Sequence, residues 1–221
     1  SILFSCSKAA TALCAHLLVQ RGLLNLNAKV SEYWPEYGQN GKEDTTVLMF
    51  LNHTAGVAAL DAPIKEGGFL DWDYTVQRLA EEKPWWQPGT RNGYHMITFG
   101  WTVGELVRRI SGKSLGQFLR DELAEPLNAD FWIGLPEDLE SRVAPMINYV
   151  PSPDDHIPAF MQAVMTNPQS LQHKAMLNMG GLDFNTRETH AAELGGGGGI
   201  SNARGMARLF LSLSESSENT Y

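Results

Sequence analysis

The chain has 221 residues, of which 43% are hydrophobic and 19% charged, and its formal net charge is −8. This length is enough for one sizeable domain with a buried core, and the composition is that of a globular protein rather than a disordered one. The acidic balance argues against nucleic acid or an anionic membrane surface as a partner. No apolar run reaches the roughly 18 residues that a membrane-spanning helix needs.

The two cysteines, Cys6 and Cys14, fall in one predicted helix. Eight residues of helical rise separate them by about 12 Å, whereas a disulfide needs Cα atoms within roughly 7 Å. We therefore expect two free thiols, which favours a reducing compartment such as the cytoplasm. The chain has no initiator methionine and no signal-peptide pattern, so we expect an excerpt that continues beyond both ends.

The first half of the chain predicts helices joined by irregular segments. Residues 9–19 are apolar on nearly every face, which predicts a buried helix that Gly22 ends. The stretch "NLNAKVSEYWPEYGQN" is polar and broken by proline, so we expect loop and short turns there. The stretch "TTVLMFLNHTAGV" predicts a short helix that Thr45 or Thr46 caps and Gly56 ends.

The second half continues this helical pattern. The stretch "DWDYTVQRLAEEKPW" predicts a helix, and the sequence from residue 98 to residue 130 predicts two helices joined around Gly112. Prolines recur from Pro136 to Pro168, which predicts loop with short ordered pieces. The glycines at 195–199 predict the most flexible backbone of the chain, as a hinge or a tight crossover, and a last helical pattern begins near Ser201. Alternation typical of strands is scarce, so we expect a mainly helical body.

The sequence "SCSK" places Ser5 and Lys8 three residues apart at the start of the first helix. Residues at this spacing have Cβ atoms about 5–6 Å apart, so Lys8 can reach the Ser5 hydroxyl. Serine becomes a nucleophile when a base takes its proton, and lysine is a base only when neutral. Burial and the positive end of the helix dipole both lower a lysine pKa. The alternative is that Ser5 is a helix cap and Lys8 a surface residue, although a capping box would have Glu or Gln in place of Lys8.

Two further residues have a pattern that could carry chemistry. Tyr94 lies in the glycine-rich stretch "PGTRNGYHM", where its phenol could relay protons to a serine, or its ring could anchor the loop. Ser114 lies in "GKSLG", which matches the esterase pattern G-x-S-x-G, but that pattern requires a preceding strand. Because a helix precedes Ser114 and Gln117 follows it, we interpret Ser114 as a structural cap.

Other site types have no support in the sequence. The histidines show no metal-ligand spacing, and H-E-x-x-H, C-x-x-C and carboxylate clusters are absent. The stretch "SGKS" lacks the glycine that a phosphate-binding loop has five residues before Gly112, because Val107 stands there. We therefore predict neither a metal nor a cofactor.

Taken in order, four stretches resemble the serine β-lactamase-like family. They are the "FSCSK" helix, "TTVLMFLNHTAGV", the segment "PGTRNGY" with the two helices after it, and "GGGGGISNARGMARLF". Within the family the sequence is similar to class C β-lactamases, family VIII carboxylesterases and D-aminopeptidases. The resemblance covers nearly the whole chain, and four matches in order are more specific than any one of them.

The resemblance implies an α+β, β-lactamase/transpeptidase-like fold, in which an antiparallel sheet is flanked by helices. Residues 1–221 would then be a partial domain, a mainly helical central excerpt that lacks most of the sheet. It also implies that Ser5 is the acyl-enzyme nucleophile, that Lys8 and Tyr94 move its protons, and that the Ser5 N–H is half of the oxyanion hole. The family's third motif, a Lys- or His-containing triplet on a strand, is not found after Gly199.

Three hypotheses about function follow. The first is hydrolysis of a small carboxylic ester through an acyl-enzyme, which Met96 favours because it replaces the Asn of the family's Tyr-x-Asn motif. The second keeps the chemistry but makes the substrate a β-lactam or a D-alanyl peptide. The third is a catalytically silent binding or assembly protein, which would not need Ser5, Lys8 and Tyr94 together. The partner expected is a small ester or amide, and the sequence does not indicate an oligomeric state.

Overall fold

A computed structural model describes residues 1–150, 152 and 156–213, and it consists mainly of helices. Along the chain the helices are α1 (Cys6–Gln20), α2 (Val47–Leu51), α3 (Trp72–Glu81), α4 (Phe99–Ser111), α5 (Leu115–Leu119), α6 (Ala159–Thr166), α7 (Leu171–Leu177), α8 (Arg187–Ala191) and α9 (Ala203–Leu211). Shorter helical turns are Val30–Glu32, Pro35–Tyr37, Gly68–Leu70, Arg120–Ala124 and Glu137–Arg142. The expected mainly helical body is confirmed.

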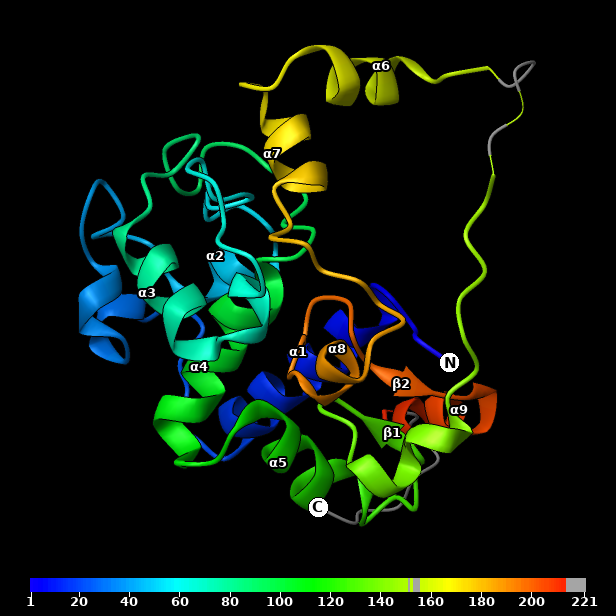
Figure 1. Ribbon diagram of the computed structural model, residues 1–221. Helices are drawn as coiled ribbons and strands as arrows, with labels where there is room; N and C mark the ends of the chain where they lie inside the picture. The colour runs from blue at the N-terminus through cyan, green and yellow to red at the C-terminus, as the bar shows by residue number, and fades with distance from the viewer. Residues whose placement is uncertain (151, 153–155, 214–221) are drawn as a thin grey trace.

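The sheet of the described residues is one antiparallel pair, β1 (Phe131–Trp132) with β2 (Ile200–Ser201). Phe131 lies opposite Ser201, and an isolated bridge joins Ile2 to Ile200. The start of the chain therefore lies beside β2, although 200 residues separate them in sequence (Figure 1). This pairing fixes the chain immediately before α1.

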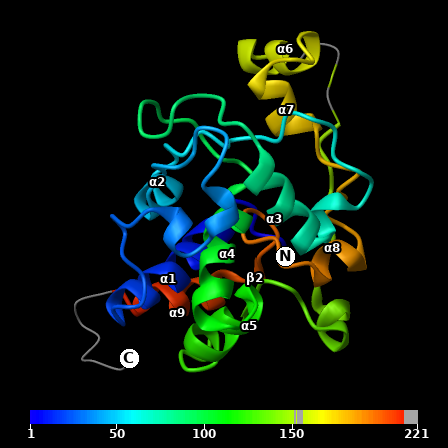
Figure 2. The ribbon, with the colours of Figure 1, turned by 90° about the vertical axis from the view of Figure 1, so that its left-hand side faces the viewer.

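The core forms around α1 and α4, which pack against each other (Figure 2). Helix α5 contacts both of them, and α2 and α3 pack against α4. The apolar sequence of α1 places Ala10, Cys14 and Leu18 in this core, as the pattern of residues 9–19 predicts. By contrast, α6 and α7 lie on an excursion away from the α1–α4 core (Figures 1 and 2).

Most of the predicted helix boundaries hold to within a few residues. Gly112 has φ +71° and ends α4 in the left-handed conformation, where glycine has no Cβ to clash. The helix after Thr46 is shorter than predicted, because it ends at Leu51 and His53 then turns left-handed with φ +63°. Residues 214–221, the end of the last helical pattern, and four residues of the proline-rich stretch (151 and 153–155) lie outside the described part.

Both cysteine thiols are free, Cys6 exposed and Cys14 buried. Burial raises the pKa of the Cys14 thiol, so this side chain acts as a small apolar group of the core. Among the described residues, every helix is too short or too polar to cross a membrane.

Candidate active site

Ser5 occupies the residue immediately before α1 and is exposed. Ser5 is thus the N-cap residue of α1, but its side chain forms no capping hydrogen bond and is free to contact Lys8 and Tyr94. The preceding residue, Phe4, has φ +46°, a conformation that costs free energy for a residue with a side chain. Ser7 holds this turn, because its hydroxyl donates to the Phe4 carbonyl at 2.6 Å and accepts from Gly199 N–H at 2.8 Å.

Lys8 is buried one helical turn after Ser5, with 7% of its surface exposed. Its Nζ lies 3.2 Å from Ser5 Oγ, 2.6 Å from the Met96 carbonyl oxygen and 2.5 Å from the Gly196 carbonyl oxygen. The two carbonyls can only accept, so they take up two N–H groups. When the amine is neutral, its lone pair therefore points at the Ser5 hydroxyl. The predicted contact between Ser5 and Lys8 is confirmed, and the reading of Lys8 as a surface residue is wrong.

The surroundings of Lys8 favour the neutral amine. Burial lowers the pKa of Lys8 from its usual 10.5, and this effect outweighs the hydrogen bond with Tyr94, which raises it. A lower pKa increases the fraction of lysine that can accept a proton near neutral pH. Desolvation is thus the main cause of the shift.

Tyr94 lies on the other side of the Ser5 hydroxyl. Its Oη donates to Ser5 Oγ at 2.5 Å, and Lys8 Nζ lies 4.8 Å from the centre of its ring. Tyr94 comes from the loop before α4 and is half exposed. The structure therefore brings together the three predicted residues, although 89 positions separate Ser5 from Tyr94.

The glycine run at 195–199 is buried, and it lies against the first two turns of α1. It receives hydrogen bonds from Lys8 at Gly196 O and from Thr11 at Gly195 O, the latter at 3.0 Å. A Cβ on Gly196 would lie 2.5 Å from the Ile97 carbonyl oxygen, so the absence of a side chain permits close backbone contact. These contacts are those of a tight, buried crossover, one of the two predicted forms of the run.

Ser114, the serine of "GKSLG", caps α5. Its Oγ accepts from Gln117 N–H at 3.2 Å and donates to Glu193 Oε1 at 2.6 Å. A helix, α4, precedes it, so the strand and sharp turn of an esterase G-x-S-x-G are not present here. The predicted capping role is confirmed.

Replacement of Ser114 by alanine is expected to lower the free energy of unfolding by about 1 kcal/mol, the usual loss for an N-cap. Labelling of the protein by a fluorophosphonate is expected to stay unchanged. Urea denaturation and a labelling time course measure the two effects. Loss of labelling in a folded Ser114→Ala protein would instead make Ser114 the nucleophile.

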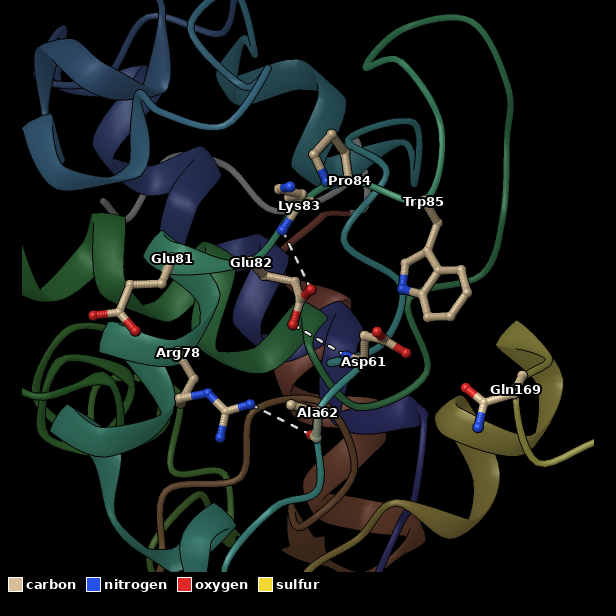
Figure 3. A pocket seen from close by; sticks show the side chains of 9 residues that line it. All are labelled: Asp61, Ala62, Arg78, Glu81, Glu82, Lys83, Pro84, Trp85 and Gln169. Atoms are coloured by element: carbon tan, nitrogen blue, oxygen red, sulfur yellow. Dashed lines mark hydrogen bonds between the residues drawn. The ribbon is translucent and has the colours of Figure 1, made fainter.

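A cavity of about 670 Å³ lies apart from Ser5, between the end of α3 and the segment that leads into α7 (Figure 3). Two of its charged side chains bind the cavity's own wall: Arg78 donates to the Ala62 carbonyl, and Glu82 accepts from the Asp61 N–H at 3.0 Å. Neither Ser5 nor Lys8 nor Tyr94 lines it. These contacts account for Arg78 and Glu82 without a ligand.

Within the described ranges, no group of three or more His, Cys, Asp or Glu side chains is arranged to hold a metal ion. The sequence reasoning also missed three groups at the site. Two are the Met96 and Gly196 carbonyls, and the third is His53, whose ring lies 5.0 Å from the Tyr94 ring. The glycine run was the one available signal for the second carbonyl, because glycine permits close approach of two backbones.

Comparison with known proteins identifies the family of the chain. The family model described as Beta-lactamase matches residues 2–220. The chain belongs to the β-lactamase family. The fold prediction is thereby confirmed, with this chain holding the helical part and little of the sheet.

Individual members of the β-lactamase family agree with the family model. The chain is 33% identical over 228 residues to the esterase/beta-lactamase LipL of Mycobacterium tuberculosis, covering 98% of this chain and 51% of that protein. It is 34% identical to a family VIII carboxylesterase of known structure, with a TM-score of 0.84, covering 96% of this chain and 55% of the other. EstA from Arthrobacter nitroguajacolicus Rue61a is 36% identical, with a TM-score of 0.83 over 95% of this chain and 55% of EstA. The chain thus spans about half the length of these relatives.

Proposed function

We propose that the protein is a serine hydrolase that cleaves small carboxylic esters through an acyl-enzyme on Ser5. One observation carries the proposal: the Ser5 hydroxyl lies between Lys8 Nζ at 3.2 Å and Tyr94 Oη at 2.5 Å. A serine hydroxyl needs a base within hydrogen-bond distance, and this one has a buried lysine whose pKa is lowered. Ser5 is also exposed, so a substrate carbonyl can approach it.

The reaction follows from these positions. Lys8 Nζ takes the Ser5 proton while Oγ bonds to the carbonyl carbon of the ester. The Ser5 N–H, which has no backbone partner among the described residues, donates to the oxygen that becomes negative. The ester C–O bond then breaks, and the alcohol leaves with a proton passed through Lys8 and Tyr94. Water attacks the acyl group by the same proton route and releases the acid.

An ester is favoured as the substrate by Met96 and by the relatives. Met96 stands where the family's Tyr-x-Asn motif has an asparagine, and its thioether cannot donate the hydrogen bond of an amide. Two of the matched structures are named as a carboxylesterase and as EstA.

A fluorophosphonate probe tests the nucleophile in the complete gene product. The wild-type protein is expected to be labelled, and Ser5→Ala is expected to lose the label completely because the oxygen that bonds to phosphorus is gone. Ser114→Ala serves as the control and keeps the label. Labelling that persists in Ser5→Ala would refute the assignment of Ser5.

A second candidate keeps Ser5 and changes the substrate to a β-lactam or a D-alanyl peptide. The relative from Mycobacterium tuberculosis supports it, since its name joins esterase and beta-lactamase. Rates on a p-nitrophenyl ester and on a chromogenic cephalosporin separate the two. A cephalosporin rate equal to the ester rate would count against the ester. A protein that reacts with neither substrate and takes no label would instead be a binding member of the family.

A further inference from the structure

His53 is bonded to both residues that flank Tyr94 in the sequence. Its backbone carbonyl accepts from Gly93 N–H at 3.0 Å, and its ring Nδ1 accepts from His95 N–H at 3.2 Å. The His53 ring also lies 5.0 Å from the Tyr94 ring and 5.1 Å from the Phe99 ring. His53 therefore contacts the residue before Tyr94, the residue after it and the Tyr94 ring itself.

This double contact depends on the backbone of His53. Its φ of +63° lies in the left-handed region, which is uncommon for residues other than glycine, and in which histidine, asparagine and aspartate are the most frequent exceptions. That conformation ends α2 early and presents both the carbonyl and the ring of His53 to the loop that carries Tyr94. The neighbouring Asn52 forms a third hydrogen bond with the loop that carries Tyr94, because its carbonyl accepts from Asn92 Nδ2 at 2.7 Å.

The contact also requires an uncharged His53. A protonated ring would carry a hydrogen on Nδ1, facing the His95 N–H, and two donors cannot bond to each other. Burial lowers the pKa of His53, and Lys8 lowers it further whenever its amine is protonated, so both favour the neutral ring. The other titratable groups that face the ring are Tyr94 and His95, and burial lowers the pKa of His95 to about 4.

We propose that His53 is a positioning residue that holds the Tyr94 hydroxyl on Ser5 Oγ. The observation behind it is the pair of hydrogen bonds that His53 accepts, one from the Gly93 N–H and one from the His95 N–H. His53 touches neither Ser5 nor Lys8 through a hydrogen bond in the described part of the chain, so it acts through Tyr94. The inference rests on the proposed function, in which Tyr94 moves a proton.

Two substitutions at this position form a matched pair. His53→Gly and His53→Asn both tolerate a positive φ and both remove the imidazole ring. The Asn side-chain oxygen can replace Nδ1 as the acceptor for His95 N–H, whereas Gly leaves this N–H unpaired. Hydrolysis of a p-nitrophenyl ester by the complete gene product is the assay, with the melting temperature recorded for each variant.

His53→Gly is expected to lower kcat roughly 10- to 100-fold with little change in KM, the cost of misplacing a proton-transfer group. His53→Asn is expected to stay within about threefold of the wild type, because it keeps the hydrogen bond to the loop. In a Tyr94→Phe background, His53→Gly is expected to add less than about twofold, because the hydroxyl that it positions is already absent.

Three results would overturn the inference while leaving the proposed function intact: wild-type kcat in His53→Gly, no recovery in His53→Asn, or fully additive losses in the double variant. Additive losses would mean that His53 supports the fold rather than the tyrosine hydroxyl. A Tyr94→Phe protein with wild-type kcat would overturn the role of Tyr94 and the inference with it. The kcat of the Tyr94→Phe single variant by itself distinguishes this result from the three above.

Discussion

Replacement of Lys8 by arginine is expected to slow acylation of Ser5 about 10²–10⁴-fold, the usual contribution of a general base. Arginine can still donate to the Met96 and Gly196 carbonyls, which Lys8 Nζ reaches at 2.6 and 2.5 Å. It stays protonated, however, and so cannot accept the Ser5 proton. The rate constant for fluorophosphonate labelling measures the effect, and circular dichroism shows whether the variant is folded.

Lys8→Met provides the complementary control, because it removes the charge and the base but also leaves the two carbonyls unpaired. Loss of labelling in both variants would assign the effect to the base.

In the wild type, labelling is expected to rise with pH as Lys8 loses its proton, and to level off below 10.5 because burial lowers this pKa. The folded chain also binds this proton less tightly than the unfolded chain, so the free energy of unfolding rises with pH between the lowered pKa of Lys8 and 10.5. Labelling by a folded Lys8→Arg protein at the wild-type rate would contradict the role of Lys8.

Replacement of Gly196 by alanine is expected to lower the free energy of unfolding by about 1–3 kcal/mol, the range for an overpacked core. The new Cβ would lie 2.5 Å from the Ile97 carbonyl oxygen, which is backbone and cannot rotate away. Because the Gly196 carbonyl accepts from Lys8 Nζ, its displacement is also expected to slow labelling of Ser5. Urea denaturation and the labelling rate constant measure the two effects.

Gly197→Ala is the matched control, one residue further along the same crossover. A Cβ there would meet nothing nearer than the Ile97 Cδ1 atom at 3.9 Å, an ordinary contact. Its effect on unfolding is therefore expected to stay within about 0.5 kcal/mol. Equal losses in the two variants would mean that the run needs glycine for its backbone conformation rather than for close packing.

Much of the local structure was predictable because it depends on neighbours in the sequence. The spacing of Ser5 and Lys8 fixes their distance once a helix forms, and Ser114 caps α5 as its pairing with Gln117 indicates. Gly112 ends α4 because glycine adopts a positive φ without a clash. The position of Tyr94 against Ser5 needed the family resemblance, since no local rule relates residues 89 positions apart.

The rest of the candidate site could not be predicted, because it consists of groups that leave little or no trace in the sequence. The Met96 and Gly196 groups that bind Lys8 are backbone carbonyls, which every residue has. A left-handed conformation such as that of His53 is uncommon for any residue other than glycine, so the sequence predicted a helix that continues through it. The glycine run was predicted as flexible because the same lack of a side chain permits both mobility and close packing.

The three hydrogen bonds of Lys8 span 3, 88 and 188 residues of chain. Only the first can form within an isolated helix, while the other two require loops of very different length to close, which slows folding. In a chain that has formed only α1, Lys8 would be hydrated and protonated, with the pKa of an ordinary lysine. We therefore expect that Lys8, the proposed base, can take a proton from Ser5 only after the crossover at 195–199 has packed against α1.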